Sequence, residues 1–200
     1  MDEPLSNLDA KLRQEMRIEI RGLQQRLKMT VVYVTHDQAE AMSMGDKVIL
    51  LRDGKIEQEG TPDALYNKPT TAFAASFIGT PPMNLMKVTA SARGYSIDGA
   101  SDVDVLEAGD RSALTFGVRP EHMRIVEKGG VEGELMSADY LGAETIVNAR
   151  IGTQTVLVQV PGHVKVPKPE NVRLAWSTEN VHVFDAESGK RNETVKALAV

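Results

Sequence analysis

The sequence predicts an α/β segment over residues 1–80, an all-β domain over residues 81–187 and a tail over residues 188–200 that is expected to be mobile. Three observations support this division. Apolar residues have helical spacing near the start of the chain, a Thr-Pro-Pro triplet at residues 80–82 breaks the pattern, and short β-branched runs separated by glycine, proline and acidic residues follow. A chain of 200 residues has room for two such domains.

The α/β segment begins with a predicted amphipathic helix. Between residues 8 and 27, apolar side chains recur at intervals of three and four, with charged and polar side chains between them. Ser6, Asn7 and Asp9 are the candidate N-cap residues. Residues 30–35 (TVVYVT) are β-branched or aromatic, which predicts a buried strand.

The rest of this segment predicts further helices and a hairpin. A short helix is expected over residues 36–45, which end on a glycine. Two apolar runs between residues 46 and 60 flank Asp53 and Gly54, a dipeptide that suits a tight hairpin turn. Residues 61–79 open on Thr-Pro and close on glycine, so they predict one or two short helices.

Beyond the Thr-Pro-Pro triplet the pattern is that of an all-β domain. The candidate strands are the apolar runs over residues 85–91, 112–120, 122–127, 131–142, 145–152, 154–160 and 172–178. This number of short strands is typical of a small barrel of the OB type.

Composition excludes several classes of function. The formal net charge is -5 and only 4% of residues are aromatic, which argues against a nucleic-acid partner because such a partner needs a basic surface and stacking rings. Cysteine is absent, so disulfides and thiolate metal sites are excluded. No apolar run approaches the ~20 residues that span a bilayer, so any membrane association is expected to go through a partner.

Polar residues that could carry chemistry occur at two places. Asp2 and Glu3 form a carboxylate pair that, taken alone, is most simply a pair of solvated charges. His36 ends the predicted strand over residues 30–35, and such a strand end faces the ligand crevice in α/β sheets. Asp37 and Glu40 lie nearby, but His36 and Glu40 supply only two ligands on one helical face, and a zinc site needs more.

Four strings, in this order, resemble the ATP-binding subunits of ABC-type importers of the carbohydrate and glycerol-phosphate branch. They are MDEPLSNLDAKLRQEM, VVYVTHDQAEAMSMGDKVILLRDGKIEQEGTP, PTTAFAASFIGTPPMNLM and TFGVRPEH. The resemblance implies part of a P-loop NTPase domain of the ABC type, with its N-terminal half missing, followed by an OB-like transport-associated domain. Two strings, PPMNLM and TENVHVFDAESGKR, are most similar to the sn-glycerol-3-phosphate subclass.

The resemblance also assigns roles to individual residues. It implies that Asp2 holds the Mg²⁺ of bound ATP, that Glu3 is the general base that orients the attacking water, and that His36 binds the γ-phosphate. The residues that match the D-loop, which lies at the dimer interface in this family, are Ser6, Asn7, Leu8 and Asp9.

Partners and location follow from the same resemblance. It implies a homodimer or a paired ATPase subunit, transmembrane permease subunits, a periplasmic solute-binding protein reached indirectly, and a regulatory protein on the OB-like domain. The implied location is peripheral, at the cytoplasmic face of the inner or plasma membrane, and the implied activity is ATP hydrolysis coupled to uptake of sn-glycerol-3-phosphate or a sugar.

The sequence departs from this family in one respect. It contains neither the phosphate-binding string G-x-x-x-x-G-K-[ST] nor a glycine-rich LSGGQ-like signature, and only Met1 remains of the apolar strand that precedes the carboxylate pair. We therefore expect a C-terminal fragment, produced by a misplaced start codon, a frameshift or an incomplete gene model, that is inactive by itself.

Two other functions are compatible with the residues. One is a regulatory or assembly module of such a transporter without catalysis. The other is a metal-dependent hydrolase built on Asp2, Glu3, His36 and Asp37.

Overall fold

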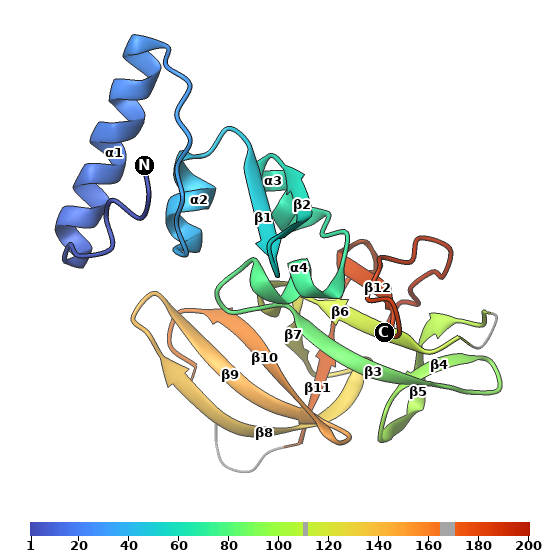
Figure 1. Ribbon diagram of the computed structural model, residues 1–200. Helices are drawn as coiled ribbons and strands as arrows, with labels where there is room; N and C mark the ends of the chain where they lie inside the picture. The colour runs from blue at the N-terminus through green and yellow to red at the C-terminus, as the bar shows by residue number, and fades with distance from the viewer. Residues whose placement is uncertain (110–111, 165–170) are drawn as a thin grey trace. The chain divides into compact units, whose positions relative to one another are not determined.

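The computed structural model describes residues 1–109, 112–164 and 171–200, and it divides into two units (Figure 1). Unit 1 comprises Met1–Lys68 and unit 2 comprises Pro69–Val200. The division therefore falls before α4 (Ala72–Phe77), earlier than the boundary expected after residue 80. The physical reason is packing, because Ala75 of this helix shares an apolar cluster with Met83 and Phe184 of the β-rich unit.

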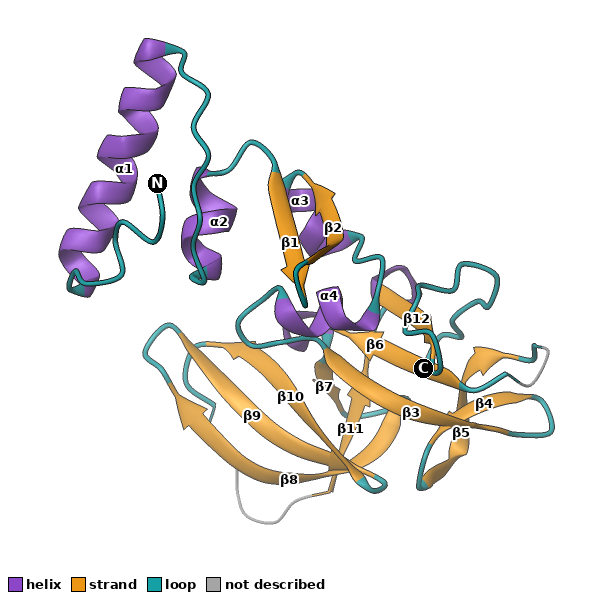
Figure 2. Cartoon of the chain, viewed as in Figure 1, coloured by secondary structure: helices purple, strands orange, loops and turns teal. Residues whose placement is uncertain are grey.

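Unit 1 combines helices with one hairpin (Figure 2). Its elements are α1 (Ala10–Leu27), α2 (Gln38–Met44), β1 (Val48–Arg52), β2 (Lys55–Gly60) and α3 (Pro62–Asn67). The predicted cap of the first helix is confirmed at Asp9, whose carboxylate accepts the N–H of Leu12 at 3.0 Å. The predicted hairpin is also confirmed, and both Asp53 (φ 50°) and Gly54 (φ 72°) have the positive φ that a type I′ turn requires.

The predicted buried strand over residues 30–35 is wrong. Only Val34 pairs, in an isolated parallel bridge with Asp2, and the side chain of Val32 is 76% exposed. β-branched composition favours an extended chain, but a strand is formed and buried only where neighbouring strands and a covering layer exist. Among the described residues, three at the start of the chain supply that pairing, which is too few for a ladder.

The apolar stripe of α1 is not covered in this structure. None of its residues is buried, and Leu23 and Leu27 are 43% and 57% exposed. The buried apolar side chains among the described residues of unit 1 are instead Leu5, Leu50 and Leu65. The helix is therefore held by its caps and by a few polar contacts, such as the 3.0 Å bond from Arg21 Nη1 to Asp46 Oδ2, more than by a core.

Unit 2 is the predicted all-β domain, and its strands form two five-stranded antiparallel sheets. The first sheet has the order β10-β9-β8-β11-β7 and the second β12-β6-β3-β4-β5. Its elements after α4 are β3 (Asn84–Ala90), β4 (Gly94–Ile97), β5 (Ala100–Glu107), β6 (Leu114–Val118), η1 (Pro120–His122), β7 (Arg124–Val126), β8 (Val131–Tyr140), β9 (Glu144–Ile151), β10 (Gln154–Pro161), β11 (Asn171–Ala175), η2 (Thr178–Asn180) and β12 (Val181–Asp185). All seven predicted strands are present, whereas β4, β5 and β12 were not predicted.

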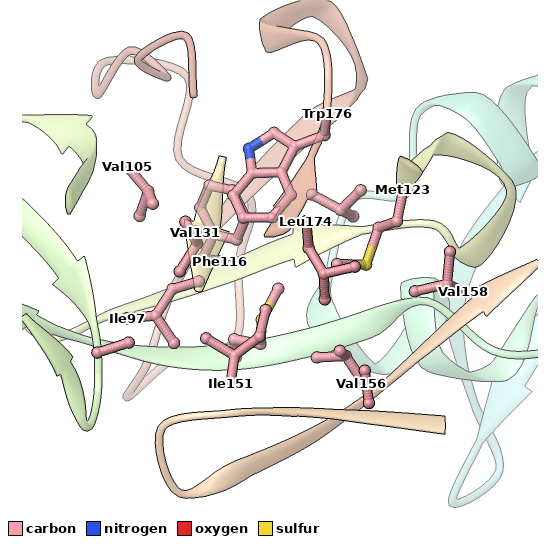
Figure 3. Packing of buried hydrophobic residues seen from close by; sticks show 14 of the residues in the cluster. Ile97, Val105, Phe116, Met123, Val131, Ile151, Val156, Val158, Leu174 and Trp176 are labelled. Carbon is pink, nitrogen blue, oxygen red and sulfur yellow. The ribbon is translucent and has the colours of Figure 1, made fainter. Parts of the chain in front are cut away.

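One hydrophobic core joins the two sheets of unit 2 (Figure 3). Phe116 of β6 meets Trp176, which follows β11, with ring centroids 5.3 Å apart and tilted by 54°. Ile151 of β9 and Val156 of β10 lie on the other side of the same cluster. Alternation of apolar side chains along each strand therefore supplies one face of each sheet to a shared interior.

Residues 188–200, for which the sequence predicts no element, add main-chain bonds to both edges of the second sheet. The N–H of Asn192 donates to Val183 of β12 at 2.8 Å, and the N–H of Leu198 donates to Val105 of β5 at 2.9 Å. Val195 packs against the core cluster between these two contacts. Both open edges of the sheet are thus paired in part by the end of the chain.

Candidate functional site

The candidate site lies in unit 1, where the start of the chain runs beside the extended residues that precede α2. The N–H of Glu3 donates to the carbonyl of Val34, and the N–H of Val34 donates to the carbonyl of Met1, each at 2.9 Å. This parallel pairing places the carboxylate pair at the same edge as His36. The sequence predicts only that His36 lies at a strand end that faces a ligand crevice, and does not predict its pairing with the start of the chain.

Glu3 occupies an unusual backbone conformation. Its φ of 41° lies in the left-handed region, which costs energy for a residue with a side chain and is enriched at functional sites. The chain turns there, and the Ser6 hydroxyl closes the turn by donating to the Glu3 carbonyl at 3.0 Å. Glu3 is therefore directed by a turn rather than by strand alternation.

Glu3 and His36 contact each other directly. The Oε1 atom of Glu3 lies 2.8 Å from Nδ1 of His36, and the two side chains are 45% and 74% exposed. This hydrogen bond, followed by the negative charge of Glu3, raises the pKa of the His36 ring above its ordinary value. A carboxylate only accepts, so Nδ1 carries the proton of this bond and Nε2 points away from Glu3.

Polar side chains fix both residues that flank His36. Asp37 caps α2, because its Oδ1 atom accepts the N–H of Ala39 at 2.7 Å. The Thr35 hydroxyl accepts the N–H of Asp37 at 2.9 Å and donates to Glu40 at 2.7 Å. The main chain at His36 is thus held on both sides.

Glu40 is almost fully buried, at 3% exposure, and is satisfied by hydroxyl groups. It accepts from Tyr33 at 2.9 Å and from Thr35 at 2.7 Å. Burial of the phenol, with the bond to Glu40, raises the pKa of Tyr33. Glu40 therefore has a structural role, and within the described part of the chain no group of three or more His, Asp or Glu side chains has the geometry of a metal site.

A small cavity collects the polar groups of the site. Its volume is about 30 Å³, and it is lined by Glu3, Ser6, Arg13, Thr35, His36, Asp37 and Glu40. A cavity of that size has room for one or two water molecules and none for a nucleotide. A water held there would lie beside the Glu3 carboxylate, which is the arrangement that general-base activation requires.

The structure brings together some of the predicted site residues and leaves others apart. Glu3, Ser6 and His36 line the cavity, whereas Asp2, Asn7, Leu8 and Asp9 are not among its lining residues. Asp2 lies in the bridge to Val34 and is exposed. Leu8 is connected to the cavity through Arg13, which lines it and donates a hydrogen bond to the Leu8 carbonyl at 3.0 Å.

The sequence did not point to Arg13, Thr35 or Tyr33 as members of this site. Arg13 is one of several cations on the predicted helix, and nothing in its spacing sets it apart. Its position becomes informative only when the cavity is known. The sequence predicts Tyr33 and Thr35 in a buried strand, and that prediction assigns no partner to their hydroxyl groups.

The residues present fit a Mg²⁺-nucleotide complex only in part. Asp2 offers one exposed carboxylate, and Mg²⁺ in nucleotide sites commonly takes one or two carboxylates together with phosphate oxygens. The exposed His36 ring offers a donor for a phosphate oxygen. The sequence contains no G-x-x-x-x-G-K-[ST] string to surround the β- and γ-phosphates, so the fit extends to one metal-binding carboxylate and one phosphate donor.

Two family models match the chain, both within unit 2. The model described as a TOBE domain matches residues 116–184, and the model described as a MalK OB fold domain matches residues 79–123. Together these matches run from the end of α4 to β12, which supports an OB-like assignment for the all-β unit.

Curated relatives match almost the whole chain. It is 45% identical over 195 residues to the sn-glycerol-3-phosphate import ATP-binding protein UgpC of Ruegeria sp. (strain TM1040). The aligned region covers 95% of this chain and 54% of that relative. The protein of that name from Jannaschia sp. (strain CCS1) is 44% identical over 191 residues, with 95% and 54% covered. That from Chromohalobacter salexigens is 43% identical over 212 residues, with 99% and 57% covered. The chain spans about half the length of the curated relatives it matches.

Proposed function

We propose that this chain, which belongs to the family of ABC-importer ATP-binding subunits and corresponds to their C-terminal part, supplies the water-activating side of an ATPase site from unit 1 and an accessory OB-like domain from unit 2. The observation that carries the proposal is the 2.8 Å contact between Glu3 and His36 beside a water-sized cavity. In this proposal ATP is the substrate that the completed site hydrolyses.

Glu3 accepts the proton of the attacking water. Its carboxylate lies at the cavity wall, and the left-handed turn at this residue directs it there. General-base assistance of this kind contributes about 10²- to 10⁴-fold to a rate.

His36 donates a hydrogen bond to the γ-phosphate. Because Glu3 holds Nδ1 and raises the pKa of the ring, the imidazole stays protonated to a higher pH and keeps a second N–H at Nε2. That N–H points away from Glu3 and is available to a phosphate oxygen. His36 would therefore sense whether the γ-phosphate is present.

Asp2 is the metal-binding residue of the proposal. Bound Mg²⁺ would supply neutralisation of phosphate charge. Asp2 would hold it through one carboxylate at the end of the Asp2–Val34 bridge.

The proposed assembly follows the family. Residues Ser6 to Asp9 face a second ATPase subunit, unit 2 supports the dimer and receives a regulatory protein, and permease subunits hold the complex at the cytoplasmic face of the membrane. The solute proposed is sn-glycerol-3-phosphate, the one in the names of the relatives. Among the residues that the structure describes, no helix is both long and apolar enough to cross a bilayer.

A chimera tests the proposal. The aligned part of the Ruegeria relative is replaced by this chain, and ATPase activity and uptake of sn-glycerol-3-phosphate are measured with the matching permease. We expect both activities in the parent chimera and a loss of about 10²-fold or more in turnover with Glu3→Gln. Glu15→Gln, on the exposed face of α1, is the matched control. Equal turnover in the Glu3→Gln and parent chimeras would overturn the proposal.

A second candidate function is a regulatory or assembly module without catalysis. The observation that favours it is that unit 2 has a complete core of its own, whereas α1 of unit 1 buries no residue. Co-expression of the chain with a full-length relative distinguishes the two functions. A module without catalysis would alter transport by the same amount whether the chain carries the parent sequence or Glu3→Gln.

A further inference from the structure

Arg13 connects two segments of the candidate site that are far apart in the sequence. It lies in the first turn of α1, and its guanidinium is partly buried at the cavity wall. Nη2 donates to the carbonyl of Leu8 at 3.0 Å, and Nη1 donates to Oδ2 of Asp37 at 3.4 Å. One planar group thus joins the chain between Glu3 and α1 to the cap of α2.

Each end of this connection continues to one member of the Glu3–His36 pair. On one side, Leu8 belongs to the short segment whose Ser6 is bonded through its hydroxyl to the carbonyl of Glu3. On the other side, Asp37 is the residue that directly follows His36, and its other oxygen caps α2. Arg13 therefore connects the segment that holds Glu3 with the segment that holds His36, and the Glu3–His36 bond connects the same two segments a second time.

The exposure of the pair explains why such a connection matters. The His36 side chain is 74% exposed, so packing does not determine where the ring lies. Three carboxylates, Glu3, Asp37 and Glu40, also line the cavity and repel one another. A cation that binds the main chain of one segment and the carboxylate of the other holds both segments and offsets this repulsion.

We propose that Arg13 is a positioning residue that holds His36 against Glu3 by tying the Leu8 carbonyl to the Asp37 carboxylate. This inference rests on the proposed function, because it concerns the pair assigned to water activation. Arginine suits the task because its fork binds two acceptors in one plane, which the single ammonium group of lysine does not.

The test uses the whole 200-residue chain and observes His36 directly. Selective ¹⁵N labelling of the four histidines gives ring nitrogen shifts by NMR, which report which nitrogen carries the proton when the ring is neutral. Because Glu3 accepts from Nδ1, the parent chain is expected to hold His36 mainly as the Nδ1–H form. His163, the other exposed histidine, provides the reference.

The variants separate positioning from charge and from folding. In Arg13→Gln, the population of neutral His36 rings that carry the proton on Nε2 is expected to rise roughly threefold or more. Partial loss of the hydrogen bond between Glu3 and His36 produces a change of that size. Arg13→Lys keeps the charge and is expected to restore the parent population only in part. Asp37→Asn keeps the cap of α2, since Asn is a good N-cap and its one oxygen can accept from Ala39. The amide NH2 group then takes the place of Oδ2 and cannot accept from Arg13.

A double-variant comparison supplies the decisive result. Asp37→Asn is expected to match Arg13→Gln, and the two changes together are expected to have no further effect, because both break one connection. Arg26→Ala, an exposed arginine in the last turn of the same helix, is the control and should leave His36 unchanged. Unchanged ring shifts in both Arg13→Gln and Asp37→Asn would overturn the inference.

Glu3→Gln distinguishes failure of this inference from failure of the proposed function. If the parent chain lacks the Nδ1–H form and Glu3→Gln changes nothing, the Glu3–His36 pair itself is absent and the proposed function loses its basis. If the pair is present and sensitive to Glu3→Gln but not to Arg13→Gln, only the role of Arg13 is refuted.

Discussion

The side chain of Asn84 bonds to both main-chain groups of Leu157. Its Nδ2 atom donates to the Leu157 carbonyl at 2.8 Å, and its Oδ1 atom accepts the Leu157 N–H at 2.8 Å. The two residues lie on β3 and β10, which belong to different sheets. A second amide, Gln154, makes the same pair of bonds to Lys87 from the opposite strand. Side-chain amides thus replace a main-chain ladder where the two sheets of unit 2 meet.

Replacement of Asn84 is expected to destabilise unit 2. Asn84 is 8% exposed, and Asn84→Ala leaves the N–H and the carbonyl of Leu157 without this partner, for an expected loss of about 2–4 kcal/mol in urea unfolding. Gln154→Ala is the matched control at a more exposed position, where water replaces the lost bonds, and should cost about 1 kcal/mol or less. Equal losses in the two variants would contradict the importance assigned to burial at Asn84.

Glu3→Gln is expected to lower the pKa of His36 toward its ordinary value. The hydrogen bond to Glu3 and the charge of Glu3 are the main causes of the raised pKa, and the neutral amide removes the charge. In the parent chain the stabilisation from this pair is complete below the unfolded pKa of about 6.5 and is lost as the pH rises through the folded pKa. NMR titration of the ring measures the shift. The pKa of His36 should be insensitive to Glu15→Gln, and insensitivity to Glu3→Gln would mean that the pair does not form in solution.

His182 is expected to make unit 2 sensitive to acid. Burial, followed by the positive charges of Arg191 and Arg119, lowers the pKa of His182 to about 4, and the ring accepts a 2.9 Å bond from Arg191. Because the unfolded chain binds a proton there first, stability is complete above about pH 6.5 and falls as the pH decreases toward about 4, by at most about 1.4 kcal/mol per pH unit.

His182→Gln tests this dependence by urea unfolding between pH 7 and pH 4. The amide can accept from Arg191 and does not titrate, so the variant should show a shallower loss of stability than the parent. His163→Gln, at an exposed position, should retain the parent slope. A parent-like slope in His182→Gln would assign the acid sensitivity to other groups.

Residues 190–198 are expected to be protected from hydrogen exchange, in contrast to the mobility suggested by their sequence. The amides of Asn192 and Leu198 donate to β12 and β5, and Val195 packs on the core. Deletion of residues 194–200 removes the Leu198 hydrogen bond to β5 and the packing of Val195. The deletion is expected to cost about 3 kcal/mol of stability, from lost apolar burial and lost hydrogen bonds. Exchange of the Leu198 amide at the rate of an unstructured peptide would support a mobile tail.

The 200-residue chain alone is expected neither to bind ATP tightly nor to hydrolyse it. The sequence has no string that cradles the β- and γ-phosphates, and the cavity beside Glu3 is about 30 Å³. Calorimetric titration with Mg-ATP and a phosphate-release assay measure both properties. Steady turnover that Glu3→Gln abolishes would show that this chain holds a nucleotide by other means.

Local sequence signals predicted most elements correctly. The Asp9 helix cap, the Asp53–Gly54 turn and the alternating strands of unit 2 depend on residues close together in the chain, so a single sequence suffices to find them. The failures have a different origin. Residues 30–35 have strand composition but gain strand structure only from neighbouring strands, and β4, β5 and β12 contain Gly, Ser, Asp or His that weaken the apolar pattern.

The candidate site shows the same limit. The sequence and the family resemblance placed Glu3 and His36 in one reaction, and the structure brings their side chains within hydrogen-bond distance. Arg13 and Thr35 were not predicted, because their roles depend on partners in other segments.

The sequence by itself determined the order of the α/β and all-β parts and several caps and turns, and the family resemblance led to Glu3 and His36 as the proposed catalytic pair. Only the tertiary structure decided that Glu3 turns into a left-handed conformation to meet His36, that Arg13 joins the two segments around them, and that Asn84 links two sheets. The physical reason is range. Periodicity and capping act within a few residues, whereas hydrogen bonds between distant segments depend on how the chain brings those segments together.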